Sequence, residues 1–196
     1  MRPRRTIVAL AVLGAAVLAG SAVLAFAVAQ PDDPERARVL LADARDVAQR
    51  HAVSMRDQAA RLAETAETTG EHREHWIADA ASMRADADRL AALAALLEKQ
   101  IAGVARVVEG PSGDLRVLRE MGRTLAIEGR SIADHGRAML PHARQMAEFA
   151  RGGDGVAEAD ALGLAASWMA DAGDRASQAG EALSRSAEGM LRGLAR

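Results

Sequence analysis

The chain of 196 residues contains no cysteine and no tyrosine, and only two tryptophans and two phenylalanines. Without cysteine it cannot form disulfides, bind a metal through thiolates, attach haem covalently or use a thiol as a nucleophile. With so few aromatic side chains, the 49% hydrophobic content comes mainly from alanine, leucine, valine and methionine. Alanine, leucine and methionine are strong helix formers, so this composition favours an all-α fold.

Lysine is also nearly missing, since Lys99 is the single lysine among 25 basic residues. The 27 acidic residues outnumber the basic ones and give a formal net charge of -2, which becomes -5 without Arg2, Arg4 and Arg5. A nucleic-acid-binding chain needs a surplus of positive charge to face phosphate groups. We therefore expect no nucleic-acid partner.

Residues 7–29 form an unbroken run of 23 apolar or small residues. At about 1.5 Å per residue, a helix of this length can cross a lipid bilayer. Arginines precede the run and Asp32 and Asp33 follow it, which places the N-terminus in the cytoplasm and the later residues outside a bacterial-type membrane. We expect a retained single-pass anchor. The alternative is cleavage near Ala29, which would release a secreted or periplasmic protein.

After a short linker at 30–33, capping and turn residues divide the rest of the chain into four segments. Asp33 can cap a helix that begins at Pro34, and glycine-containing or proline-containing breaks follow later. These signals predict four helices within 34–196, over about 34–67, 71–109, 112–151 and 156–194. Long helices joined by short loops favour an up-down-up-down antiparallel four-helix bundle, here preceded by an N-terminal transmembrane or signal helix.

In the last three predicted helices, a large apolar residue recurs every seven positions and alternates with a small one. A large residue facing a small one lets antiparallel helices approach closely. The large positions are Trp76, Met83, Leu90, Leu97 and Val104, then Leu118, Leu125, Ile132, Met139 and Met146, then Leu162, Met169, Leu183 and Met190. Alanine or glycine fills most of the alternate positions, including Ala80, Ala87, Gly122, Gly129, Gly136, Gly173 and Gly180.

Two irregularities interrupt this regular pattern. In the first helix the apolar seam runs through Leu40 and then shifts by one residue before Met55, with His51 at the shift. In the third helix Pro141 lacks the N–H that would bond the carbonyl four residues earlier, so we expect one bent helix there. Both irregularities lie near polar residues of the predicted core, as expected if a functional site interrupts the regular packing there.

The third predicted helix places His135, Met139, His142 and Met146 on one stripe, at i, i+4, i+7 and i+11. Imidazole and thioether groups suit a soft metal ion such as Cu(I), or a haem iron. Counting outward from the predicted turns brings further side chains to the same height in the bundle. The expected layer contains Met55, Met83, Met139 and Met169 beside Trp168, with His51 and His135 about one turn away.

We therefore predict an extracytoplasmic protein that is tethered to the lipid bilayer through residues 7–29 and binds Cu(I), with Ag(I) as its mimic, in the bundle core. The predicted ligands are His51, Met55, Met83, His135, Met139, His142 and Met169. One alternative is a b-type haem held by histidine and methionine or by two histidines. Another is a structural or interaction scaffold whose methionines only fill the core. No nucleophile elbow or phosphate loop indicates an enzyme, and pairing of bundles through alanine-rich faces stays open.

Overall fold

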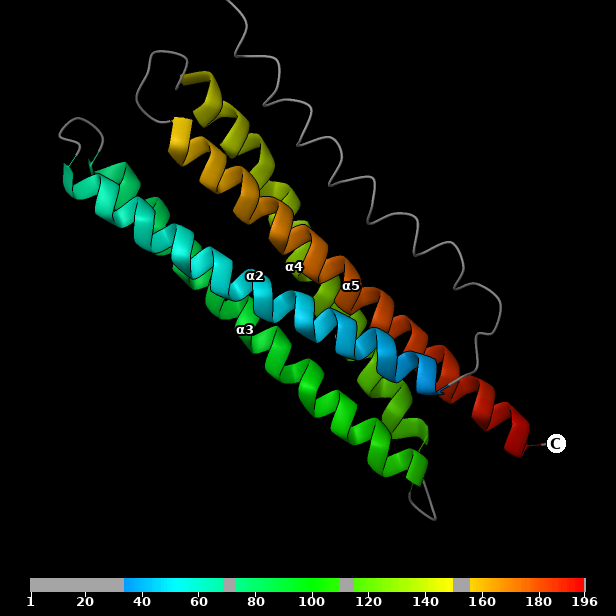
Figure 1. Ribbon diagram of the computed structural model, residues 1–196. Helices are drawn as coiled ribbons and strands as arrows, with labels where there is room; N and C mark the ends of the chain where they lie inside the picture. Colours follow the sequence, from blue (N-terminus) through cyan, green and yellow to red (C-terminus); the bar gives the residue numbers. More distant parts are fainter. Residues whose placement is uncertain (1–33, 69–72, 110–114, 150–155, 196) are drawn as a thin grey trace, which may run out of the picture. The chain divides into compact units, whose positions relative to one another are not determined.

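The described part of the chain, residues 34–68, 73–109, 115–149 and 156–195 of a computed structural model, is helical throughout and contains no strand (Figure 1). Its elements are α2 (Pro34–Thr68), α3 (Arg73–Glu109), α4 (Leu115–Phe149) and α5 (Val156–Leu194). Residues 7–29, the linker and the first or last few residues of two predicted helices lie outside the described residues. The all-α expectation and the four-helix bundle are confirmed.

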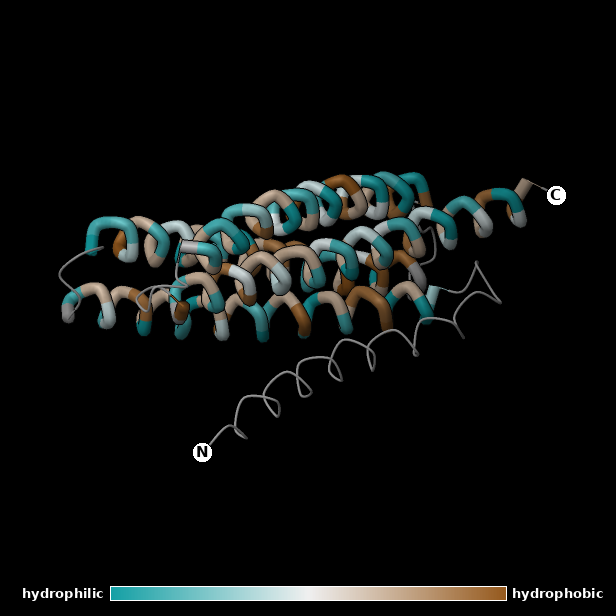
Figure 2. Tube along the Cα trace, turned by 90° about the horizontal axis from the view of Figure 1, so that it is seen from above, coloured by the Kyte–Doolittle hydropathy of each residue, from teal (hydrophilic) through white to brown (hydrophobic). Residues whose placement is uncertain are grey.

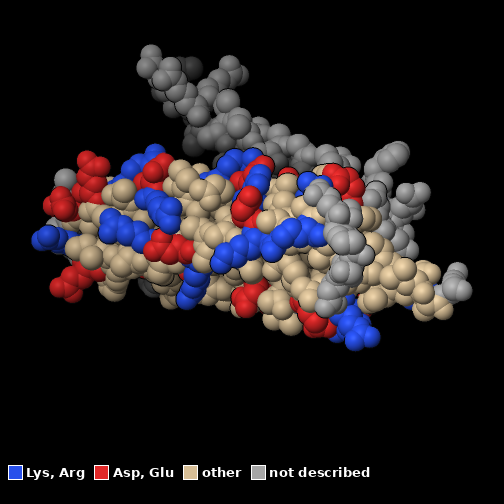
Figure 3. Space-filling view, turned by 90° about the horizontal axis from the view of Figure 1, so that it is seen from below, with Lys and Arg blue, Asp and Glu red and all other residues tan. Residues whose placement is uncertain are grey.

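The four helices run alternately up and down (Figure 1). Two ion pairs join α2 to α3: Arg45 Nη1 lies 2.6 Å from Glu98 Oε2, and Arg56 Nη2 lies 2.8 Å from Asp88 Oδ1. The later α2 residue, Arg56, pairs with the earlier α3 residue, Asp88, which is the order that antiparallel neighbours require. Basic and acidic side chains are interspersed over the face drawn in Figure 3. Such exposed pairs contribute little to stability, so the fold depends on the apolar seams.

Hydrophilic and hydrophobic residues follow one another within the turns of every helix (Figure 2). The large seam residues of α3, from Trp76 to Val104, are all buried, at 5% exposure or less. In α2 the buried seam passes through Leu41 instead of the expected Leu40, and continues unbroken at seven-residue spacing to Met55. The second seam of α2 does shift by one residue next to His51, where Ala44 is followed by Ala52.

The tightest contact in the bundle is between the backbones of α4 and α5. A Cβ atom added at Gly129 would meet the backbone nitrogen of Ser177 and would lie 2.6 Å from the carbonyl oxygen of Gly173. Gly122 and Gly136 repeat this contact one heptad before and one heptad after. The sequence places these glycines at the small positions of the seam, and the structure shows that they face the neighbouring backbone itself.

Helix α5 has the most extensive contacts of the four described helices, and it packs against α4, α2 and α3. It therefore buries a third line of residues that the two predicted seams do not include. That line keeps the seven-residue spacing and consists of Glu158, Ala165, Ala172, Ala179 and Ser186, all buried.

The helix α4 continues without a break through Pro141, as expected. None of the four described helices combines the length and the apolarity that a membrane span requires. Residues 32–196 form one compact unit, and the buried core of the described helices lies entirely within it. A fragment with these bounds keeps that whole core, so we expect it to fold by itself.

We predict that Gly129→Ala lowers the free energy of unfolding of the 32–196 fragment by about 3 kcal/mol, the upper range for overpacking, because only backbone atoms lie opposite. Gly163→Ala is the matched control, because nothing lies within 4 Å of its added Cβ. It gains helix propensity and raises stability by up to about 1 kcal/mol. Urea denaturation measures both. Equal effects of the two substitutions would contradict backbone contact along this seam.

Candidate ligand-binding cleft

A cleft of about 710 Å³ lies between α3 and α4, with one side chain of α5 at its floor. These two helices are consecutive in the chain, yet they touch each other far less than α4 touches α5. The residues that line the cleft are Arg89, Ala92, Leu93, Leu96, Thr124, Glu128, Ser131, Ile132, His135 and Met169. Its volume falls within the range of roughly 300–1,000 Å³ that is typical of ligand sites.

The cleft opens because of where the small residues of α4 point. Gly122, Gly129 and Gly136 draw α4 against the backbone of α5. On the side of α4 that faces α3, no glycine seam among the described residues draws the helices together, and the half-buried Ile132 and Leu96 line the cleft. The seam that tightens one pair of helices therefore leaves the next pair apart.

The floor of the cleft is apolar and its rim is polar. Leu93 is 3% exposed and Met169 is fully buried, while Leu96 and Ile132 are half-buried. The rim carries charged and hydroxyl-bearing side chains that are exposed, namely Arg89, Thr124, Glu128, Ser131 and His135. An apolar surface with a few polar groups at its edge is the usual composition of a binding site for a small organic molecule.

A buried carboxylate organises one end of the cleft. Asp86 of α3 is 2% exposed, and its Oδ1 lies 3.0 Å from Arg89 Nη1 and 3.2 Å from His135 Nε2. Its Oδ2 is buried and makes no hydrogen bond within the described residues. Burial of a carboxylate is costly unless charged or hydrogen-bonded partners compensate it. Asp86 therefore holds Arg89 and His135 in place at the rim.

The Nε2 atom of His135 lies between two groups that compete for it. Arg89 Nη1 is 3.1 Å away and can only donate, whereas Asp86 Oδ1 is 3.2 Å away and can only accept. When Nε2 carries a proton, it donates to Asp86; when it does not, it accepts from Arg89. Whether Nε2 carries a proton, which depends on the tautomer of the ring, thus decides which α3 side chain His135 binds.

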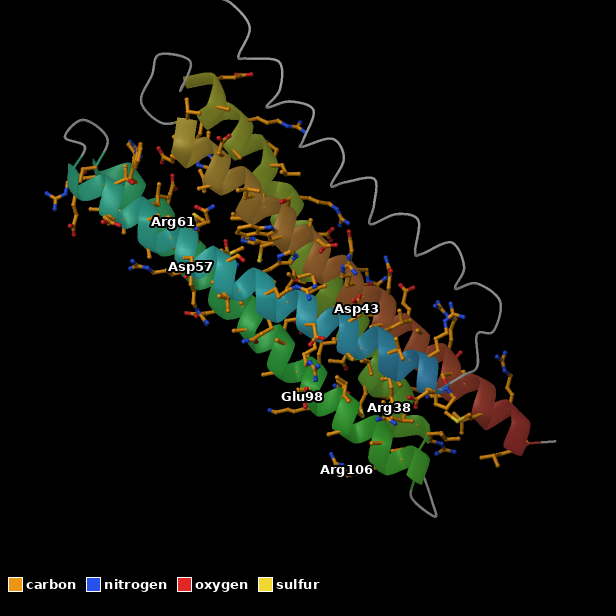
Figure 4. All side chains as sticks on the ribbon, viewed as in Figure 1. Arg38, Asp43, Asp57, Arg61, Glu98 and Arg106 are labelled. Atoms are coloured by element: carbon orange, nitrogen blue, oxygen red, sulfur yellow. The ribbon has the colours of Figure 1, made fainter. Side chains whose placement is uncertain are left out.

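The other core histidine lies on a different side of the bundle, between α2 and α5. His51 Nε2 is 3.1 Å from Asp171 Oδ2, and its ring stacks on Trp168 with centroids 5.8 Å apart. Hydrogen bonding to His51 lowers the pKa of the Asp171 carboxyl, helped by the nearby Arg175. Arg175 also pairs with Asp43, labelled in Figure 4, at 2.8 Å. This network joins α2 to α5.

The structure places the seven predicted metal ligands in different surroundings. Met55, Met83 and Met169 are fully buried in one hydrophobic cluster, and Met139 packs against that cluster while partly exposed. His51 bonds Asp171, as described above. His142 is exposed, so its imidazole does not reach the core methionines as the stripe predicted. Only His135 and Met169 line the same cavity.

The α4–α5 register explains part of this separation. Gly136 lies opposite Ala166 and Ala170, so Met139, nearly one turn further along α4, lies about one turn from Met169 in height. Across α3 and α4, the observed partner of His135 is Asp86. Within the described ranges, no group of three or more histidine, aspartate or glutamate side chains is placed to hold a metal ion.

Sequence reasoning missed Asp86, although the sequence contains a signal for it. Asp79, Asp86, Leu93 and Gln100 recur every seven residues on the flank of the predicted α3 seam, and the last three are buried. A polar residue on a line that also carries leucine indicates a buried polar contact.

Comparisons with models of protein families, with curated proteins and with solved structures find no match for this chain.

A second buried carboxyl, Glu158 of α5, lies against Asp79 of α3 and is 1% exposed. Loss of solvation, the hydrogen bond with Asp79 and the charge of Asp79 raise the pKa of Glu158 to about 8. At neutral pH the Glu158 carboxyl is therefore protonated and donates to Asp79. The half-buried Asp79 is thus the partner that compensates the buried Glu158.

We predict that the stability of the 32–196 fragment falls between pH 5 and pH 9 because of Glu158. Its pKa is higher in the folded chain than in the unfolded chain, so the folded state binds more protons in this window and loses its advantage as pH rises. The loss is about 2–4 kcal/mol. Glu158→Gln keeps a neutral donor, so urea denaturation of this variant should show a flatter pH dependence. Identical pH profiles for both proteins would contradict this assignment.

Proposed function

We propose that this protein is a non-catalytic, membrane-tethered binding protein of the extracytoplasmic space, and that its ligand enters the cleft between α3 and α4. The observation that carries the proposal is the cleft itself, with its apolar floor over Leu93 and Met169 and its ordered polar end at Asp86, Arg89 and His135. A helix pair that only had to complete the core would bring these apolar side chains into contact.

The location rests on the sequence. The apolar run at residues 7–29 follows arginines and precedes acidic residues, which supports a single-pass anchor with the bundle outside the cytoplasm. Cleavage near Ala29 would instead release the bundle. In either case the cleft would face the extracytoplasmic space, where lipids, their breakdown products and metal ions are available.

We predict that a neutral apolar dye, Nile red, binds the 32–196 fragment and gains fluorescence in the cleft. Ala92→Phe places a ring over the cleft from an exposed position of its lining, and weakens the dissociation constant at least about tenfold, roughly 1.4 kcal/mol. Ala60→Phe makes the same change at an exposed position of α2 that does not line the cleft, and leaves binding unchanged. Equal weakening by both variants would place the dye elsewhere.

A second candidate is the soft metal ion, now with a smaller ligand set. His135 and Met169 line one cavity, and Asp86 contacts the Nε2 atom of the imidazole, which leaves Nδ1 as the atom that would ligate. A carboxylate behind a histidine is a common arrangement around metal ligands. We therefore propose Cu(I) or Ag(I) at this pair, with a b-type haem held by the same two residues as the alternative.

We predict that Ag(I) raises the melting temperature of the 32–196 fragment by several degrees through mass action. Met169→Leu and His135→Asn abolish this rise, whereas Met190→Leu, a half-buried position far along α5, keeps it. The triple variant Met55→Leu, Met83→Leu, Met139→Leu separates the two proposed sites, because it loses silver only if the core layer holds the ion. Equal copper content in all variants by elemental analysis would exclude both sites, and a Soret band would indicate haem instead.

A further inference from the structure

Arg89 is fixed by one nitrogen and open at the others. Both of its hydrogen-bonding contacts use Nη1, which lies 3.0 Å from Asp86 Oδ1 and 3.1 Å from His135 Nε2. Its Nε and Nη2 atoms make no hydrogen bond within the described residues, and its side chain is 57% exposed. The Nε–Nη2 edge of a guanidinium is the edge that binds a carboxylate through two parallel hydrogen bonds.

The position of this open edge matters because it lies at the end of an apolar surface. Arg89 and His135 form one end of the cleft, and Leu93, Leu96, Ile132 and Met169 continue from it. The α4 residues of the lining, from Thr124 to His135, span about 16 Å at 1.5 Å per residue. The cleft therefore offers the guanidinium of Arg89 at one end and a long apolar surface that continues from it.

Charge sets the direction in which such a ligand would lie. Glu128, the acidic residue of the lining, is seven residues before His135 and therefore about 10 Å away along α4. An anionic group is repelled at that end and attracted to Arg89 at the other. The buried Asp86 carboxylate holds Arg89 from below, so little side-chain freedom is lost when a ligand binds.

We propose that the cleft binds a free single-chain amphiphile with a carboxylate head, such as a fatty acid. The head binds the Nε–Nη2 edge of Arg89, with His135 beside it, and the chain lies over Leu93, Leu96, Ile132 and Met169. This inference rests on the proposed function, since it names the class of molecule that the cleft takes. It also explains why the cavity is much larger than a metal ion needs.

Isothermal titration of the 32–196 fragment with dodecanoate and with dodecyltrimethylammonium, both below their micellar concentrations, tests the proposal. Dodecanoate should bind at least about tenfold more tightly than the cationic amphiphile. Arg89→Gln should weaken dodecanoate binding about tenfold or more, the scale of a charge-assisted hydrogen bond. It should not weaken binding of the cationic amphiphile, because it removes a positive charge beside Asp86. His135→Gln should weaken dodecanoate binding less than Arg89→Gln does.

Arg84→Gln is the matched control, because this substitution makes the same change in net charge. Arg84 is exposed on the same helix and does not line the cleft. It should leave both affinities unchanged. Equal binding of the two amphiphiles, or equal weakening by Arg84→Gln and Arg89→Gln, overturns the carboxylate inference while the proposed binding function stands. Failure of Nile red and both amphiphiles to bind the folded wild-type fragment overturns both.

Discussion

The backbone contact between α4 and α5 is the constraint on which the rest of the bundle depends. Glycines at heptad spacing let the two helices approach until a Cβ on either one would meet the opposite backbone. Close approach strengthens dispersion contacts along the whole interface, and it fixes the register because each glycine must face its partner. Helix α5 is thereby committed to α4 on one side and to α2 on the other, and it has the most extensive contacts of the described helices.

The cleft is the consequence of that commitment. Leu96 of α3 and Ile132 of α4 line an open space, and these two helices touch each other far less than α2 touches α3. A bundle with four equal seams would close around its core. One tight seam in place of four equal ones leaves an open side, and the open side is where a ligand can reach apolar surface without unfolding the domain.

The two buried carboxyls of α3 and α5 show two solutions to the same physical problem. Asp86 lies beside an arginine and a histidine and orients both of them at the cleft. Glu158 lies beside another acid, which raises its pKa, so it keeps its proton and binds Asp79 as a neutral donor. The first solution produces a cationic group at the surface, whereas the second only joins α3 to α5. This difference is why the cleft end at Asp86 is the functional candidate.

The methionines and histidines show what residue type and spacing alone can predict about a metal site. Methionine fills seam positions and also binds soft metals, and both uses produce the same seven-residue spacing. Burial of Met55 and Met83 in the hydrophobic cluster suits either use, whereas Met169 also lines the cleft. A stripe on one helix does not determine which neighbour it faces, and His142 lies on the side that faces solvent.

The sequence by itself determined the helical class, four helices nearly to the residue, and the seams from Trp76 to Val104 and from Gly122 to Gly136, because helix propensity and heptad spacing are local properties. The tertiary structure alone decided that the α4–α5 seam is tighter than the others, that Asp86 is buried, and that His135 and Met169 share a cleft while His51 and His142 do not. These outcomes depend on how closely each pair of axes approaches. That distance results from all side chains at an interface together, so no single helix encodes it.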